Sequence, residues 1–117
     1  MELARVEIIA SISKIEELKD SLSRFGITGM TVFQVLGCGV QNGKQEYELE
    51  KKEVPNLLPK QMVMLIVPKK DLDKFLKFVK EELYTGHIGD GKIFISDISN
   101  VIRVRTGEEG YEAVSVK

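Results

Sequence analysis

The feature that most constrains the fold is an internal repeat. Two G-x-x-G segments, at residues 26–29 and 86–89, lie 60 positions apart, and each joins an amphipathic helical pattern to a β-branched apolar one. A further apolar segment precedes each helical pattern, so each half has the order strand, helix, strand. Two such halves are typical of a split β-α-β sandwich, in which one antiparallel sheet carries both helices on one face. The sequence therefore predicts one α+β domain of 117 residues with a ferredoxin-like β-α-β-β-α-β order.

Strands are predicted where short apolar, β-branched runs end at turn residues. These runs cover residues 3–10, 31–36, 61–67 and 92–98, and a shorter one covers residues 101–104. The run at 61–67 has almost no polar interruption, as expected of a strand that is covered on both faces. Because both helices are expected on one face of the sheet, we predict that the other face packs against further subunits.

The two helices are predicted from apolar side chains that recur every three or four residues. Ser13 with Glu16 predicts a capping box at the start of the first helix, and Asp71 predicts the N-cap of the second. Gly26 and Gly86 lie where helix C-terminal glycines are common. The predicted buried faces consist of Ile15, Leu18, Leu22 and Phe25 in the first helix and Leu72, Phe75, Leu76, Val79 and Leu83 in the second.

Residues 40–59 differ in composition from the rest of the chain. Gln, Asn, Lys and Glu dominate this segment, which also contains Pro55 and Pro59. A compact domain rarely carries a connection of about 20 residues without secondary structure. Two interpretations stay open, a solvated hairpin extension or a mobile binding loop on a rigid scaffold.

Charge and apolar length exclude several classes of function. The chain has 17 basic and 18 acidic side chains, so no overall field attracts nucleic acid or an anionic membrane. The longest apolar run, residues 62–67, is too short to cross a bilayer, and the first residues show no signal-peptide pattern. Cys38 is the only cysteine, so no internal disulfide can form. We predict a cytoplasmic protein without a nucleic-acid partner.

Three clusters are suited to binding an anion. Gly37-Cys38-Gly39 follows the second strand, where glycines let backbone N–H groups point at a phosphate, although G-x-G also marks ordinary turns. Residues 86–92, G-H-I-G-D-G-K, precede a strand, whereas a Walker A loop leads into a helix and is therefore excluded. Arg103 and Arg105 alternate in a predicted extended segment, so both guanidinium groups are expected on one face.

These clusters and their neighbours resemble the motifs of PII nitrogen-regulatory signalling proteins. Residues 85–94 have the sequence T-G-H-I-G-D-G-K-I-F and residues 101–110 have V-I-R-V-R-T-G-E-E-G, similar to the two C-terminal motifs of that family. Residues 26–32, G-I-T-G-M-T-V, and residues 58–60, L-P-K, also match. The resemblance covers essentially the whole chain.

The resemblance implies a homotrimeric signalling protein rather than an enzyme. Residues 40–59 would form the T-loop, residues 85–92 the B-loop and residues 101–110 the C-loop. In such proteins the T-loop docks onto an ammonium transporter or a nitrogen-metabolism enzyme, so any membrane contact is indirect. ATP or ADP binds in the clefts between neighbouring subunits.

The resemblance also implies the binding residues. Lys60 would pair with the distal carboxylate of 2-oxoglutarate, and Gln41 would ligate a Mg²⁺ held by the ATP phosphates. The implied nucleotide contacts are Ile9, Thr31, Gly37, Gly39, Gly89, Asp90, Gly91 and Lys92, with Arg103 and Arg105 coming from the next subunit.

Other functions are weighed against this one. His87 is the only histidine, so it is the one candidate for a phosphohistidine enzyme, but no orienting acid is evident. One cysteine and one histidine cannot form a zinc site alone. Val40 and Met64 replace an arginine and an acidic residue that are usual in the family. The alternative is therefore a PII-like sensor tuned to a different nucleotide or small-molecule effector.

Overall fold

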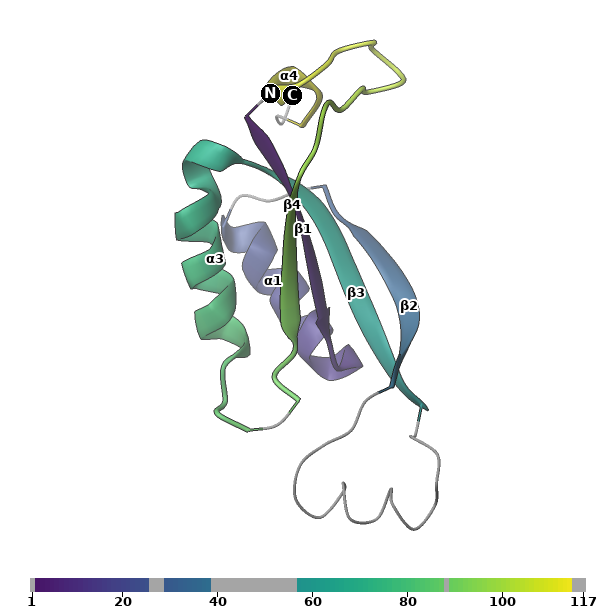
Figure 1. Cartoon of the computed structure of the whole chain (residues 1–117), viewed down its shortest axis with the longest axis vertical. Coiled ribbons are helices and arrows are strands. Elements are labelled where there is room, and N and C mark those ends of the chain that lie inside the picture. Colours follow the sequence, from purple (N-terminus) through teal and green to yellow (C-terminus); the bar gives the residue numbers. More distant parts are fainter. Residues whose placement is uncertain (1, 26–28, 39–56, 88, 115–117) are drawn as a thin grey trace.

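The computed structural model describes residues 2–25, 29–38, 57–87 and 89–114. The chain forms the strands and helices of two β-α-β halves, followed by a short C-terminal helix (Figure 1). In chain order these elements are β1 (Leu3–Ala10), α1 (Ile12–Phe25), β2 (Thr31–Cys38), β3 (Leu57–Pro68), α3 (Lys69–Leu83), β4 (Lys92–Asp97) and α4 (Tyr111–Val114).

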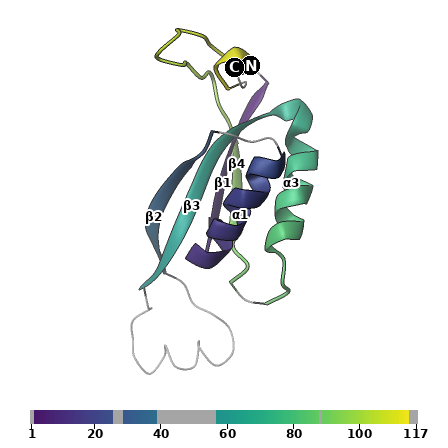
Figure 2. The same ribbon diagram turned by 180° about the vertical axis from the view of Figure 1, so that it is seen from behind.

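The four strands form one sheet in the order β2-β3-β1-β4. Every neighbouring pair is antiparallel. Helices α1 and α3 lie side by side on one face of the sheet, as both views show (Figures 1 and 2). This is the ferredoxin-like α+β arrangement that the repeat predicts, so the predicted fold is confirmed.

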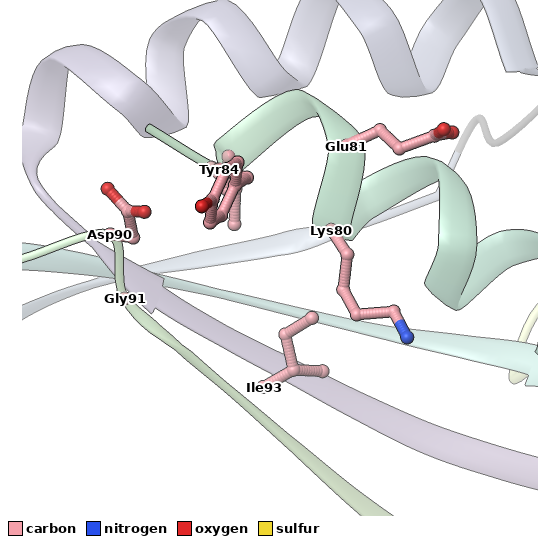
Figure 3. A pocket seen from close by; sticks show the side chains of 7 residues that line it. Lys80, Glu81, Tyr84, Asp90, Gly91 and Ile93 are labelled. Carbon is pink, nitrogen blue, oxygen red and sulfur yellow. The ribbon is translucent and has the colours of Figure 1, made fainter. Parts of the chain in front are cut away.

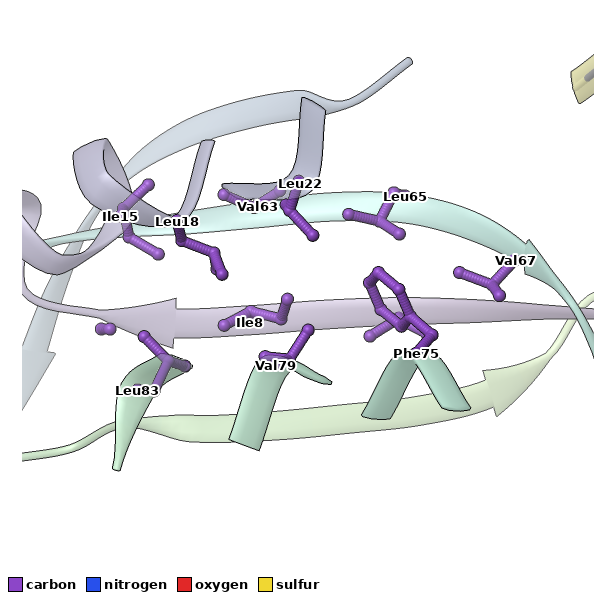
Figure 4. Close-up of a cluster of buried hydrophobic side chains, with 12 residues drawn as sticks. Ile8, Ile15, Leu18, Leu22, Val63, Leu65, Val67, Phe75, Val79 and Leu83 are labelled. Atoms are coloured by element: carbon purple, nitrogen blue, oxygen red, sulfur yellow. The ribbon is translucent and has the colours of Figure 1, made fainter. Parts of the chain in front are cut away.

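The hydrophobic core lies between the sheet and the two helices (Figure 4). It forms because alternate residues of a strand point to the same face, so that Val6, Ile8 and Ala10 are all buried in β1. Phe75 and Val79 of α3 are fully buried against this face, and Phe25 packs edge-on against Phe75. The predicted helix faces are confirmed. Buried in the two helices are Ile15, Leu18, Leu22, Phe75, Val79 and Leu83, and partly buried against them are Phe25, Leu72 and Leu76.

The opposite face of the sheet is mainly apolar and is not covered by either helix. Cα partners across the strands share a face, which places two rows of side chains here. Phe33 and Phe94, on the two edge strands, are 39% and 47% exposed. The rows run Phe33, Met62, Ile9, Lys92 and Thr31, Met64, Glu7, Phe94. We call this surface the open face. Its packing against further subunits stays a prediction.

The strand boundaries around the central segment differ from the prediction. β3 begins at Leu57 and passes through Pro59, and β2 continues to Cys38, which pairs with Leu57. The predicted loop of residues 40–59 is therefore wrong at its C-terminal end. Proline is tolerated because β1 pairs with β3 only from Gln61 onward, so one edge of Pro59 needs no N–H donor.

Both predicted helix N-caps are wrong. α1 begins at Ile12, and the backbone N–H of Lys14 donates to the Ser11 hydroxyl oxygen at 3.4 Å, so Ser11 rather than Ser13 caps it. α3 follows Pro68 without a side-chain cap, and Asp71 lies in its first turn. Its first N–H, that of Lys69, donates instead to the Glu2 carbonyl at 2.9 Å, which removes the need for a side-chain acceptor.

Two further boundaries follow from the C-terminal part of the chain. β4 ends at Asp97, one residue before the predicted end. Residues 101–104 form no strand, only an isolated bridge between Ile102 and Glu109, because the chain turns back on itself there. Among the described residues, no helix is long and apolar enough to span a membrane.

Candidate functional site

Apart from Thr31, the predicted contact residues that the structure describes fall into two groups at opposite ends of the sheet (Figure 1). Lys92 begins β4 beside Ile9, its Cα partner near the end of β1. β4 then runs to Asp97, about 17 Å further along at the usual rise of a strand. The segment with Arg103 and Arg105 lies beyond that end. The two arginines and Lys92 therefore cannot contact one small anion within a single chain.

Thr31 is separated from Lys92 in the other direction. Thr31 lies on edge strand β2 and Lys92 on edge strand β4, with β3 and β1 between them. Three strand spacings amount to about 14 Å. The structure thus brings Ile9, Gly91 and Lys92 together and leaves Thr31 on the far edge.

The loop between α3 and β4, residues 84–91, is organised by one carboxylate. Asp90 accepts hydrogen bonds from the Thr85 N–H at 2.8 Å, from the Gly86 N–H at 3.0 Å and from the Thr85 hydroxyl. The Thr85 hydroxyl oxygen also accepts from the His87 N–H at 3.2 Å. These bonds, first among them that from the Thr85 hydroxyl, lower the pKa of Asp90 to about 2. Asp90 is therefore a fixed anion that shapes the loop.

Gly91 lies where only glycine fits. Its φ is +106°, and an added Cβ would lie 2.4 Å from the carbonyl oxygen of Ile9. Gly89 also has a positive φ, +100°, but an added Cβ there would meet nothing within 4 Å. The close approach of the loop to β1 at Gly91 is what brings Lys92 beside Ile9.

Gly37 lies inside a strand and not at its end, and its predicted contact with the nucleotide stays a prediction. It lies opposite Leu58 in β2 and has no positive φ. An added Cβ would lie 2.8 Å from Cε of Lys60, because the Lys60 side chain runs across this glycine. Gly37 therefore makes room for Lys60, the second residue predicted for the effector site. Gly39 and Gln41 lie outside the described residues, and so does the predicted magnesium ligand set.

Arg103 and Arg105 were expected on one face of an extended segment, and this prediction is wrong. Residues 104–106 form a turn, closed by hydrogen bonds from the Arg103 N–H to the Glu108 carbonyl at 2.8 Å and from the Gly107 N–H to the Arg103 carbonyl at 2.7 Å. The Arg103 guanidinium donates to Glu108 Oε1 at 3.0 Å and to the Ala113 carbonyl at 3.1 Å. Arg105 is exposed in the turn itself.

Residues 100–113 are held together by further polar contacts that were not predicted from the sequence. Asn100 accepts from the N–H groups of Val101 and Gly110 at 2.8 and 3.2 Å, and it donates to Glu109 at 2.6 Å. At the start of this segment, Lys69 forms a 2.8 Å ion pair with Asp97. These contacts therefore support the turn that contains Arg105.

A cavity of about 470 Å³ lies beneath the 84–91 loop (Figure 3). In Figure 3 the Glu81 carboxylate points away from the other lining side chains. The cavity is on the helix side of the sheet, apart from the open face, and sequence reasoning gave no indication of it. Its lining consists of Lys80, Glu81, Leu83, Tyr84, Asp90, Gly91 and Ile93.

Lys14 is the other residue that sequence reasoning missed. Its Nζ donates to the carbonyl of Leu83 at 2.9 Å and lies 3.8 Å from Asp90 Oδ1. The contacts span about 70 residues of sequence, so no local pattern could have indicated them. Cys38 and His87 are both exposed, and the described residues contain no cluster of three His, Cys, Asp or Glu suited to a metal ion.

The comparisons with known proteins agree on one family. The model of the family described as nitrogen regulatory protein P-II matches residues 3–108. The nitrogen regulatory protein P-II of Pasteurella multocida is 39% identical over 112 residues, which are 96% of this chain and all of the relative. The nitrogen regulatory protein P-II 1 of Methanothermobacter thermautotrophicus is 38% identical and covers 96% of this chain and 97% of its own length.

Solved structures are similar over the same extent. The ATP complex of GlnK from B. subtilis matches with a TM-score of 0.77 at 37% identity and covers 95% of this chain and 94% of its own. The citrate-bound PII of Arabidopsis thaliana matches with a TM-score of 0.75 at 33% identity and covers 96% of this chain and 92% of its own.

Proposed function

Because the chain belongs to the nitrogen regulatory protein P-II family, we propose that it reports metabolic state by binding ATP or ADP between the subunits of a homotrimer. Like other members of this family, the chain is a nitrogen-regulatory signalling protein and not an enzyme. The nucleotide, the effector, the trimer and the target are the parts that we propose.

The observation that carries the nucleotide proposal is the likeness, over almost the whole chain, to a GlnK solved as its ATP complex. In this chain the glycines of the 84–91 loop and Lys92, the first residue of β4, can meet a polyphosphate. Lys92 supplies a point charge, and Gly89 and Gly91 allow close approach of the backbone.

A site shared between neighbouring chains accounts for the separation of the proposed contacts. Ile9, Gly91 and Lys92 lie at one end of the open face, and Arg103 and Arg105 lie past the other end. A neighbouring chain packed on the open face would place its arginines beside the first chain's Lys92. Because Thr31 lies on the far edge strand, the Thr31 that contacts a given nucleotide would come from the neighbouring chain. Closed rotational symmetry then makes equivalent sites at every interface.

We propose 2-oxoglutarate as an effector that binds with Mg-ATP. Gln41 would hold the Mg²⁺ through its amide oxygen, and a hard cation with oxygen ligands is chemically suited to that place. Lys60 can pair with the distal carboxylate, since its side chain crosses Gly37 at the end of the β2–β3 ribbon. A citrate-bound relative supports a small polycarboxylate as ligand of this family.

The segment between β2 and β3 is proposed as the docking loop, without residues 57–59, which belong to β3. Because Gly37 and Lys60 lie near the ends of the two strands that this segment joins, a ligand there would restrain the directions in which it leaves the domain. The target is an ammonium transporter or a nitrogen-metabolism enzyme, in the cytoplasm. The nucleotide and the effector each change the affinity of the other by the same factor. Because the bound ligands restrain the loop, a partner that needs the free loop is released when both are bound.

Met64 favours a second candidate, a sensor for another nucleotide. It is the Cα partner of Thr31 on the open face and offers no polar group except a weak thioether acceptor. A base that hydrogen-bonds to a carboxylate in relatives would lose that partner here.

Calorimetric titration with ATP, ADP, AMP and GTP, with and without 2-oxoglutarate and Mg²⁺, tests both candidates. We expect ATP or ADP to bind, and we expect the Lys92→Ala and Arg103→Ala substitutions each to weaken binding by about 1.5–3 kcal/mol, the usual worth of a hydrogen bond to a charged group. Preference for a guanine nucleotide would favour the second candidate. Binding that is unchanged in both variants would place the site elsewhere.

A further inference from the structure

One side of the 84–91 loop borders a pocket. Asp90 and Gly91 form part of the wall of the 470 Å³ cavity, whose other walls come from α3 and from Ile93 at the start of β4 (Figure 3). On that side the loop gains few dispersion contacts, whereas Gly91 approaches Ile9 and Ala10 of β1 closely. On the pocket side, the loop is therefore held mainly by its polar contacts.

Those polar contacts lead to Lys14 of α1. The ammonium group donates to the carbonyl of Leu83, the last residue of α3, at 2.9 Å and lies 3.8 Å from Asp90 Oδ1. The Lys14 and Asp90 side chains are only 25% and 23% exposed, so water screens the pair less than it would an open surface pair. We call Lys14, the Leu83 carbonyl and Asp90 the brace.

The position of Lys14 on its own helix is unfavourable. Ser11 caps α1, so Lys14 is the third helical residue, where the positive end of the helix dipole repels a cation. Its partner carbonyl is at the C-terminus of α3, where the dipole attracts a cation. The hydrogen bond and the ion pair of the Lys14 ammonium group are therefore to α3 and to the loop rather than to its own helix.

We propose that Lys14 is a positioning residue, which through the brace holds the 84–91 loop in the shape that presents Gly89, Gly91 and Lys92 to the nucleotide. The inference rests on the proposed nucleotide site, since Lys14 is assigned no contact with the ligand. Asp90, which the sequence analysis assigned to the nucleotide, then acts from inside the loop. Its Oδ2 accepts from the Thr85 and Gly86 N–H groups, and its Oδ1 accepts from the Thr85 hydroxyl and lies 3.8 Å from Lys14 Nζ.

The first test needs no nucleotide. NMR measurement of solvent exchange in the intact protein should show the Thr85 and Gly86 amides exchanging about tenfold faster in Lys14→Met, the equivalent of one lost charge-assisted bond. Lys19→Met is the matched control, because it removes a lysine of the same helix whose ion pair is with Glu16, at 3.2 Å, and not with Asp90. If Lys14→Met does not fold, Lys14→Gln, which removes the charge but keeps a polar group, replaces it. Equal exchange in the Lys14 variant and in the control overturns the brace.

The second test measures ATP affinity in the same proteins. We expect Lys14→Met to weaken binding about tenfold and Lys14→Arg to restore it to within about threefold, because an arginine keeps the charge and can donate to both partners. Lys14→Met that binds as wild type, or Lys14→Arg as weak as Lys14→Met, contradicts the proposal. Wild type that binds no nucleotide overturns the proposed function, whereas the exchange difference still decides whether the brace holds the loop.

Discussion

At the scale of single residues, the contacts around Asp90 and Gly91 explain the shape of the 84–91 loop. Asp90 draws two N–H groups and a hydroxyl inward, and Gly91 lets the chain pass against the Ile9 carbonyl. The glycines of this loop, and Lys92 directly after it, could be predicted as a candidate anion cradle from their residue types. The inward direction of Asp90 could not, because it depends on φ angles and on Thr85, five residues away.

Thr85→Val should raise the pKa of Asp90 from about 2 toward its ordinary 3.8, because the Thr85 hydroxyl is the largest cause of the depression. A carboxyl whose pKa is lower in the folded state contributes stability above pH about 4, and this contribution is lost as the pH falls toward 2. Acid unfolding of Thr85→Val should therefore depend less steeply on pH in that window. A carboxyl NMR titration checks the pKa, with Thr106→Val as control; an unshifted midpoint in Thr85→Val would count against this account.

Gly91→Ala should destabilise the protein by about 1–3 kcal/mol, the usual cost of a strained backbone conformation, or by more. The reason is the φ of +106° together with the 2.4 Å approach of a Cβ to the Ile9 carbonyl oxygen. Gly29→Ala, whose Cβ would meet nothing within 4 Å, should stay within about 0.5 kcal/mol. Urea unfolding of the two variants measures the difference, and equal stabilities would show that the loop does not need this close approach.

At the scale of elements, the apolar periodicity predicted every strand of the sheet and the buried faces of both long helices. It could not predict the ends of the elements. Pro59 reads as a strand breaker, yet it is tolerated on a stretch of β3 that pairs only with β2. Both helix starts were misplaced because backbone geometry, at Ser11 and at the Glu2 carbonyl, decides the cap rather than the nearest capping-box pattern.

Ser11→Ala should therefore destabilise the protein more than Ser13→Ala. Loss of an N-cap acceptor costs about 0.5–2 kcal/mol, and we expect the lower half of that range because the Lys14 N–H to Ser11 Oγ distance is 3.4 Å. Ser13 is exposed and accepts no backbone N–H in the structure, so its replacement should have almost no effect. Thermal unfolding compares the two. A larger effect at Ser13 would support the capping box that the sequence first suggested.

At the scale of the whole molecule, the apolar open face and the two separated groups of site residues have one common explanation. A single chain leaves Phe33 and Phe94 partly exposed and keeps the arginines apart from Lys92 by at least the length of β4. A neighbouring chain on the open face would cover the two phenylalanines and bring its arginines to Lys92 of the first chain. The family motifs predicted that the site is shared, but the distance along β4 comes only from the structure. Gln41 and Gly39 lie outside the described residues, so their part of the site stays a prediction.

The most direct measurement of the shared site uses oligomers mixed from two damaged chains. Lys92→Ala and Arg103→Ala subunits, refolded together and purified as mixed trimers by two different tags, are titrated with ATP. If Lys92 and Arg103 act from neighbouring chains, each mixed trimer contains one interface with both residues intact, and one site per trimer should bind ATP with wild-type affinity. If both residues act within one chain, no mixed trimer contains an intact site. The account predicts the recovery of one site, and mixed trimers that bind as weakly as either parent would contradict it.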